Sequence, residues 1–232
     1  MFIWEILSNK GIINPFIFSS PSKVIKTIVN LYDSNNLLIH IKTTLYETIF
    51  AFLLSVIISL VLSIMLYLSK TLNKILDPFL TCLNSLPKVA LGPMIIIICG
   101  ANTKSIITMA VLINVIVSTI VITNGFYGTE PIKIKLMQTF KANRYQMLKY
   151  LVIPNSYKTI ISSLKLSISM SLIGVITGEF LVSKAGLGYL IIYGTQVFNL
   201  NLVVSGIIIL LIMSYILYKL VCLLEKKLIK DK

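Results

Sequence analysis

The sequence has few of the residues that carry enzymatic chemistry. It contains a single histidine, His40, so there is no HExxH zinc motif, and no Ser-His-Asp set can be recognised. The three cysteines, Cys82, Cys99 and Cys222, lie in or beside apolar runs without CxxC or Cys/His spacing, which predicts buried free thiols. No Walker lysine motif is present, so the chain does not itself hydrolyse ATP. These features predict a protein that is not an enzyme and that holds no cofactor and no metal.

Charge is also scarce. Charged residues make up 12% of the chain and only eight residues are acidic, whereas hydrophobic residues make up 56%. The hydrophobic residues gather in several runs close to the ~20 residues that a bilayer requires. This composition excludes an ordinary soluble protein and predicts an all-α integral membrane protein. The net charge of +13 does not indicate nucleic-acid binding, because the basic residues lie between and after the apolar runs.

The apolar runs predict five membrane-spanning helices. Residues 46–68 form the first clear span. A second span begins at Asp77 and is interrupted by Pro87 and Pro93. The remaining three apolar runs cover residues 105–123, 160–182 and 202–224.

The basic residues indicate how these spans are oriented. Thirteen lie after the first span, within residues 127–158 and from Lys219 onward, and six lie on the opposite side. Because basic residues favour the cytoplasmic side, a multi-pass cell-membrane protein with an external N-terminus and a cytoplasmic C-terminus is expected. The chain then divides into an N-terminal interfacial or external segment (1–36), a transmembrane domain (37–226) and a basic cytoplasmic tail (227–232). Residues 22–32 have the amphipathic pattern of an interfacial helix.

A polar, basic stretch at residues 127–158 separates the third and fourth spans and has the pattern of two short helices. Asn143 is placed to cap the second helix, and Gln146, three residues later, could complete a capping box. Pro154 is expected to end that helix before the next span. The apolar residues share one face of each helix: Leu136, Met137 and Phe140 on the first, and Tyr145, Leu148 and Val152 on the second. Two exposed helices joined by a tight turn would form a protrusion that a partner can grip.

This stretch resembles the cytoplasmic Glu-Ala-Ala loop of ABC importer permeases. That loop runs Glu-Ala-Ala, three residues, Gly, nine residues, Ile-x-Leu-Pro. Aligned on the final proline, Leu151 and Ile153 take the Ile and Leu places, and Pro154 matches. Residues 142–146 are similar to the start of the second short helix in this family.

The stretch also departs from the family pattern at two places. Residues 135–137, Lys-Leu-Met, stand where the family has Glu-Ala-Ala, and Lys141 stands in the glycine place. Glycine adopts a positive φ at little cost, whereas lysine does so poorly. Either Asn143 or a relaxed turn therefore supplies the bend, or the loop has a different shape.

Two further strings extend the resemblance over roughly residues 20–228. Residues 86–93, Leu-Pro-Lys-Val-Ala-Leu-Gly-Pro, resemble the second core helix of the same permeases. Gly-Leu-Gly-Tyr at 186–189, after the acidic Glu179, resembles the segment that dips back toward the membrane beyond their fourth core helix. The sequence is most similar to sulfonate, nitrate, taurine and thiamine-precursor permeases. These usually carry a further apolar N-terminal helix, so either this member has lost it or its start was assigned late.

The resemblance implies the fold of a type-1 ABC importer permease, with a helical coupling loop at 127–158. Two copies, as a homodimer, would form the pore for a small sulfonate-, nitrate- or thiamine-precursor-like solute. An external binding protein would deliver the solute, and cytoplasmic ATPases would switch the pore between outward and inward access. The implied ATPase-docking residues are Ala142, Asn143, Arg144, Tyr145, Gln146, Met147, Leu148, Ile153 and Pro154. The alternative, motivated by the changed loop positions, is a degenerate membrane scaffold that transports nothing.

Five residues are candidates for the translocation path: Pro87, Asn114, Glu179, Gly186 and Gly188. Pro87 would either kink its span or bend it around the path. Asn114 would either join neighbouring helices by hydrogen bonds or contact the solute. Glu179 lies near the far end of its span, where it would be a solvated or paired interfacial carboxylate or a functional one facing a cavity.

Overall fold

All regular structure in the described part of the chain is helical, as expected. The computed structural model describes residue 5, residues 19–34 and residues 36–230. The helices are α3 (Pro21–Asp33), α4 (Asn36–Leu68), α5 (Lys70–Ser85), the 3₁₀ turn η1 (Lys88–Leu91), α6 (Gly92–Cys99), α7 (Thr103–Tyr127), α8 (Pro131–Thr139), α9 (Arg144–Met147), the π-helical turn η2 (Leu148–Val152), α10 (Ile153–Val182), α11 (Leu187–Gln196) and α12 (Leu200–Lys230). The amphipathic helix expected at 22–32 is present as α3, although its place at the membrane interface stays a prediction.

Four continuous helical segments are long and apolar enough to cross a membrane. They are Asn36–Leu68, Thr103–Tyr127, Arg144–Val182 and Leu200–Leu228. The fifth expected span is a broken one, because Lys70–Ser85 and Lys88–Cys99 meet at an angle of 100°. The described helices therefore agree with four or five spans.

The break in the second expected span begins at Leu86-Pro87. Leu86 is extended, with ψ 144°, as is usual for a residue that precedes proline. Pro87 then leads into η1 instead of continuing α5. Pro87 therefore turns the chain through about a right angle. This change of direction is larger than the kink expected of a proline within a single span.

Small side chains allow α4, α7 and α10 to pack closely in the centre of the molecule. A Cβ atom on Gly174 of α10 would lie only 2.5 Å from the Cα atom of Ala110 of α7. On α4, Ser63 is buried and its hydroxyl donates to the carbonyl of Thr119 on α7 at 3.2 Å. Close approach of this kind replaces bulky apolar packing in a membrane, where lipid is as apolar as leucine.

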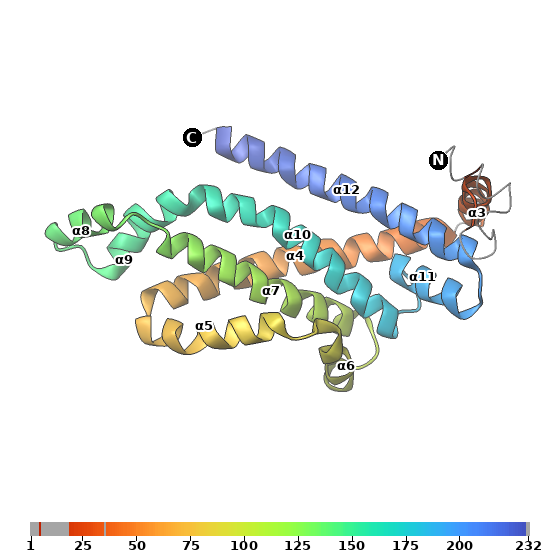
Figure 1. Ribbon diagram of the computed structural model, residues 1–232, viewed down its shortest axis with the longest axis horizontal. Helices are drawn as coiled ribbons and strands as arrows, with labels where there is room; N and C mark the ends of the chain where they lie inside the picture. Colours follow the sequence, from red (N-terminus) through yellow and green to blue (C-terminus); the bar gives the residue numbers. More distant parts are fainter. Residues whose placement is uncertain (1–4, 6–18, 35, 231–232) are drawn as a thin grey trace.

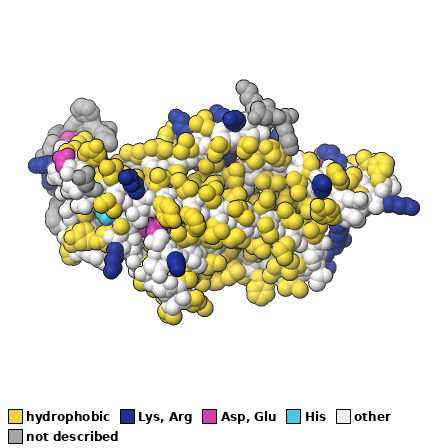
Figure 2. Space-filling view, turned by 180° about the vertical axis from the view of Figure 1, so that it is seen from behind, with side chains coloured by type: hydrophobic (Ala, Val, Ile, Leu, Met, Phe, Trp, Pro, Cys, Tyr) yellow, Lys and Arg dark blue, Asp and Glu magenta, His cyan; other side chains and the backbone are white. Residues whose placement is uncertain are grey.

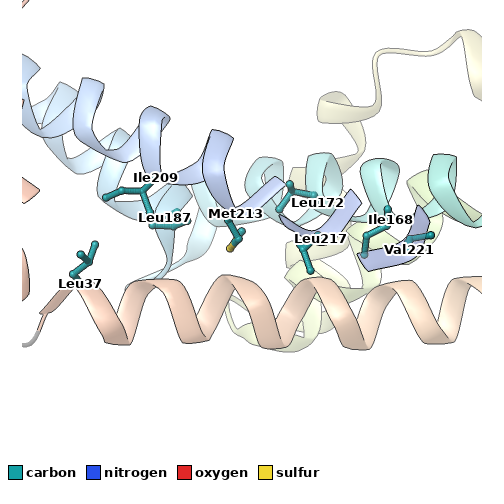
Figure 3. Close-up of a cluster of buried hydrophobic side chains, with 8 residues drawn as sticks. All are labelled: Leu37, Ile168, Leu172, Leu187, Ile209, Met213, Leu217 and Val221. Carbon is teal, nitrogen blue, oxygen red and sulfur yellow. The ribbon is translucent and has the colours of Figure 1, made fainter. Parts of the chain in front are cut away.

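The other side of α10 packs against α12, with α4 and α11 completing the contact. Eight buried apolar residues from these four helices form one cluster: Leu37, Ile168, Leu172, Leu187, Ile209, Met213, Leu217 and Val221 (Figure 3). Nearer the loop, the ammonium group of Lys165 on α10 pairs with Glu225 on α12 at 2.9 Å. Lys165 therefore joins α10 to α12.

The surface and the ends of the molecule differ in composition. Apolar side chains cover the long middle of the face shown in Figure 2, and basic side chains lie mostly toward its ends. Many large apolar side chains are exposed, including Ile57 at 61% and Leu211 at 64%, as expected for helices that face lipid. The helices α8 and α9 project at one end, whereas α3, α6 and α11 lie toward the other (Figure 1).

Candidate functional site

The two-helix loop, residues 127–158, turns sharply between α8 and α9. Lys141, in the glycine place of the family pattern, has a φ of +56°. The N–H of Lys141 donates to Gln138 O at 2.9 Å, and the N–H of Ala142 donates to Met137 O at 3.1 Å. The loop therefore keeps the left-handed bend that a glycine would allow, and the lysine bears a strain of roughly 1–2 kcal/mol. Of the alternatives left open by the sequence, neither Asn143 nor a relaxed turn is needed to supply this bend.

The second short helix begins at a complete capping box. The side chain of Asn143 accepts a hydrogen bond from Gln146 N at 2.8 Å, and the side chain of Gln146 accepts one from Asn143 N at 2.8 Å. Each contact satisfies a backbone N–H that the helix start leaves without a partner. The capping prediction is confirmed, and it explains how a four-residue helix holds its shape at an exposed tip.

Arg144 connects the loop to the end of the first span. Its guanidinium group donates to the carbonyl of Leu68, the last residue of α4, at 3.0 Å. The side chain also lines a pocket with Tyr67, Lys70 and Met147, and this pocket has about 190 Å³ of space for water. Arg144 is therefore turned toward its own chain and fixes the loop relative to α4.

The exposed surface of the loop is partly apolar. Ile132, Leu136 and Phe140 are 79%, 57% and 74% exposed, and Tyr145 is 62% exposed. Among the other candidate docking residues, Asn143, Gln146 and Pro154 are also exposed. Ala142, Met147 and Ile153 are half-buried. A surface of this kind gives a partner apolar area to cover.

The prediction that Leu148 shares an exposed face with Tyr145 is wrong. Leu148 is 3% exposed and packs with Ile122, Phe126 and Val152 in a cluster between α7 and the start of the fourth span. The turn before Leu148 is an ordinary one, since the N–H of Leu148 donates to Arg144 O. At about 100° per residue, Tyr145 and Leu148 lie roughly 60° apart around the helix, so Tyr145 faces outward while Leu148 faces the cluster with α7. Leu148 supports the loop from inside.

The prediction that Pro154 ends the second short helix is also wrong. The helix continues from Arg144 to Val182 without a break. In η2 the N–H of Ile153 donates to the carbonyl of Leu148, five residues back, and Pro154 follows in the first turn of α10. The wider turn accommodates a residue that has no N–H and whose ring would crowd the preceding turn.

Three of the predicted path residues meet at the opposite end of the molecule. Glu179, near the end of α10, is 1% exposed, and its carboxyl group accepts a hydrogen bond from Gly188 N at 2.5 Å. Cβ atoms on Gly186 and Gly188 would lie 2.3 Å and 2.8 Å from atoms of Glu179, and Gly186 has a φ of +116°. The Gly-Leu-Gly segment is thus wrapped around a buried carboxyl group, so Glu179 is not solvated.

Residues of the first span complete this carboxyl site, and sequence reasoning missed them. The hydroxyl of Thr44 donates to Glu179 Oε1 at 2.6 Å and accepts from Leu187 N at 2.8 Å. One turn before, Nδ1 of His40 accepts from Gly186 N at 3.0 Å. One turn after Thr44, Glu47 is 1% exposed and faces Glu179. The spacing of His40, Thr44 and Glu47 on one helical face was the available signal.

The two remaining path candidates lie apart from this site. Asn114 is fully buried, and its side-chain amide donates to Ser167 O at 3.0 Å and to Ser171 Oγ at 2.7 Å. Its carbonyl oxygen accepts from Ser118 Oγ at 2.7 Å. Asn114 thus joins α7 to α10, as one of its two predicted readings held. Pro87 lies at the right-angled break and is exposed.

Membrane-crossing helices with a protruding loop of two short helices define the permease class of transport subunit. The fold is similar to a chain in inward-facing structures of the MetNI methionine ABC transporter, with a TM-score of 0.68 and 15% identity, covering 82% of this chain and 92% of that one. Residues 51–230 match the model of the binding-protein-dependent transport system inner membrane component, and the chain belongs to this family.

Curated relatives agree with this family. The putative aliphatic sulfonates transport permease SsuC of Bacillus subtilis is 26% identical over 98% of this chain and 83% of its own length. The riboflavin transport system permease RibX of Chloroflexus aurantiacus is 31% identical over 93% of this chain and 80% of its own length. The protein is therefore a multi-pass membrane component of an ABC importer, and these relatives do not favour the alternative of a degenerate scaffold that transports nothing.

Proposed function

We propose that two copies of this chain form the pore of an importer for a small anionic or heterocyclic solute. In this arrangement the two-helix loop lies in the cytoplasm and receives the ATPase, and the end with α11 faces the external binding protein. The sulfonate and riboflavin systems among the relatives, and the formylaminopyrimidine transport permease ThiX of Halalkalibacterium halodurans at 24% identity, support the solute class.

The observation that carries the proposal is the ordered, exposed loop. Its bend at Lys141 and its capping box at Asn143 preserve the shape of a docking element, although the sequence has changed at the positions that identify the family motif. A subunit that no longer contacts an ATPase has no need of exposed apolar side chains such as Phe140 and Tyr145. Burying each of them would contribute roughly 1.5–3 kcal/mol to binding.

The charge of the loop supports its proposed cytoplasmic position. Six basic residues lie within 127–158, and α12 runs toward the same end of the molecule and finishes in a basic tail. A cysteine placed at Lys184 should react with an impermeant thiol reagent in intact cells, whereas one placed at Lys141 should not. The reverse labelling pattern would overturn this orientation.

Reconstitution tests the whole proposal. The permease, the ATPase and the binding protein encoded beside it are placed in liposomes, with candidate solutes added outside and ATP inside. We expect solute uptake that requires ATP and the loaded binding protein, and a cross-linked permease pair within the complex. ATP hydrolysis that is indifferent to the binding protein, with no uptake of any solute the binding protein holds, would contradict it.

A further inference from the structure

Glu47 is the buried polar side chain that the permease function leaves unexplained. It lies on α4 and is 1% exposed, and neither of its carboxyl oxygens accepts a hydrogen bond within the described part of the chain. An ionised carboxylate without a partner is among the most costly groups to bury. The charge of Glu47 must therefore be removed by a proton or balanced by a cation.

The geometry around Glu179 shows which of two facing carboxyl groups carries the negative charge. Thr44 accepts a hydrogen bond from Leu187 N, so the hydroxyl proton of Thr44 is free to point at Glu179 Oε1. Gly188 N donates to the other oxygen, Oε2. Both oxygens of Glu179 thus act as acceptors, which is the arrangement that stabilises an ionised carboxylate.

Among the described residues, no cation forms an ion pair with either carboxyl group. His40 accepts from Gly186 N through Nδ1, so its imidazole is neutral, and its ring stacks on Tyr189 at 5.9 Å. The described residues form two ion pairs, Lys133–Glu130 and Lys165–Glu225, and neither involves this site. The lysines nearest to the site along the chain are Lys42 on α4, Lys104 at the start of α7 and Lys184 just after α10, and all three are exposed.

A proton can reach Glu47 from a pocket at this end of the molecule. The pocket has about 300 Å³ of space for water. Its polar and charged lining residues are Thr43, Glu47, Asn102, Thr103, Ser183 and Lys184. Some of these polar groups already form hydrogen bonds, since Asn102 caps α7 and Thr43 donates to Ile39 O. The buried carboxyl group of Glu47 is thus a polar group of the pocket wall that still lacks a hydrogen-bond partner.

We propose that Glu47 and Glu179 form a proton-binding site, in which one proton resides on Glu47 and is donated to the ionised carboxylate of Glu179. Two facing carboxyl groups in a site of this kind do not both ionise, so they share one proton. The shared proton joins α4 to α10, and through Gly188 to α11. When the proton leaves at high pH, two buried negative charges face each other and the contact between these helices weakens.

The site predicts a sign for the dependence of stability on pH. The folded permease keeps a proton that the unfolded chain has already lost, so its stability falls as the pH rises and stops falling once the folded protein has also released the proton. While the folded protein keeps the proton and the unfolded chain has lost it, the unfolding temperature of the purified permease should fall by about 3–5 °C per pH unit. Glu47→Gln, which imitates the protonated group, should remove this dependence. The exposed carboxyl group of Asp33 provides the matched control, and Asp33→Asn should leave the dependence unchanged.

Infrared difference spectroscopy of the permease in nanodiscs tests where the proton resides. The wild-type protein should show the carbonyl stretch of a protonated carboxyl group, which disappears as the pH is raised. The band should be absent in Glu47→Gln. In Glu179→Gln it should remain at a shifted frequency, because the proton stays on Glu47.

Several results would overturn the proposal. They are a wild-type protein without the carboxylic acid band, a band that survives Glu47→Gln, and a pH dependence that survives Glu47→Gln. If Glu47→Gln does not fold, the wild-type titration and the Glu179→Gln spectrum still decide the outcome. Neither measurement requires transport, so a failure of the proposed transport function would leave this result unaffected.

Discussion

The two ends of this permease are ordered in opposite ways. At the loop end, shape comes from contacts between residues three to five positions apart, such as Asn143 with Gln146 and Ala142 with Met137. At the carboxyl site, hydrogen bonds join residues 135 to 146 positions apart, such as Thr44 with Glu179 and His40 with Gly186. The bend at Lys141 and the capping box at Asn143 can form before the helices assemble, whereas the carboxyl site exists only after α4, α10 and α11 have met. The loop end presents an exposed surface to a partner, whereas the hydrogen bonds of the carboxyl site form only when the three helices are packed together.

The largest effect is expected where the loop depends on the bundle. Leu148→Asp places a charge in the cluster with Phe126 and Val152 and should destabilise the permease by at least about 3 kcal/mol. The measurement is unfolding of the purified protein in detergent. Met147→Asp, at a half-buried neighbour, is the control and should cost much less. Equal stability of the two variants would mean that Leu148 does not support the loop.

The next largest effect tests the long-range end. Gly186→Ala should destabilise the permease by about 2–4 kcal/mol, because alanine is strained at φ +116° and its Cβ would lie 2.3 Å from Glu179. Gly100→Ala is the matched control. Gly100 also has a positive φ, of +81°, but its nearest neighbour is an exposed Asn102 side-chain atom at 3.1 Å. The difference in unfolding free energy between the two variants isolates the contact with the carboxyl group, and a difference near zero would contradict it.

A smaller effect, on binding alone, is expected at the tip of the loop. Tyr145 is 62% exposed, so Tyr145→Asp should leave the stability of the permease unchanged. It should weaken binding of the ATPase by about 10- to 100-fold, the equivalent of losing one buried aromatic side chain. The measurement is co-purification of the ATPase with tagged permease, with Lys149→Ala as a neutral control. Full retention of the ATPase by Tyr145→Asp would mean that this face does not dock.

The smallest effect concerns the bend. Lys141→Gly should stabilise the loop by about 1 kcal/mol, because glycine adopts a φ of +56° without strain. The same substitution at Lys135, an exposed position inside α8, should instead cost about 0.5–1 kcal/mol. Amide hydrogen exchange within residues 131–147 measures both effects. Slower exchange in Lys135→Gly than in Lys141→Gly would show that the turn is not strained.

The sequence was most informative where structure is local. The apolar runs predicted the spans, and Asn143 with Gln146 predicted a capping box that the structure confirms. The apolar period grouped Leu148 with the exposed Tyr145, because it does not show where the boundary between the exposed and buried faces lies. The helix end expected at Pro154 was wrong because the π-helical turn before it has no clear signature in the sequence.

The carboxyl site was only half predictable for the opposite reason. Glu179 and the Gly-Leu-Gly segment lie within ten residues of each other and could be singled out together. Glu47 and Thr44 join them from a helix more than 130 residues earlier. Their spacing with His40 groups them on one helical face, but it does not indicate which distant residues they contact. Contacts between distant segments depend on how the helices pack, and the apolar pattern of a lipid-facing helix specifies that packing weakly.

The unbroken helix from Arg144 to Val182 has a mechanical consequence. It begins in the docking tip and ends beside Glu179, so a rod about 50 Å long spans the distance between the two ends. If the ATPase tilts this rod by about 10° around its middle, each end moves by roughly 4 Å in opposite directions. A displacement of the tip would then move Glu179 relative to Thr44 and change the hydrogen bond between them. The helix itself would transmit this movement, with no chain of side-chain contacts in between. The wide turn at η2, which lets the rod pass through Pro154 unbroken, is what gives the lever its full length.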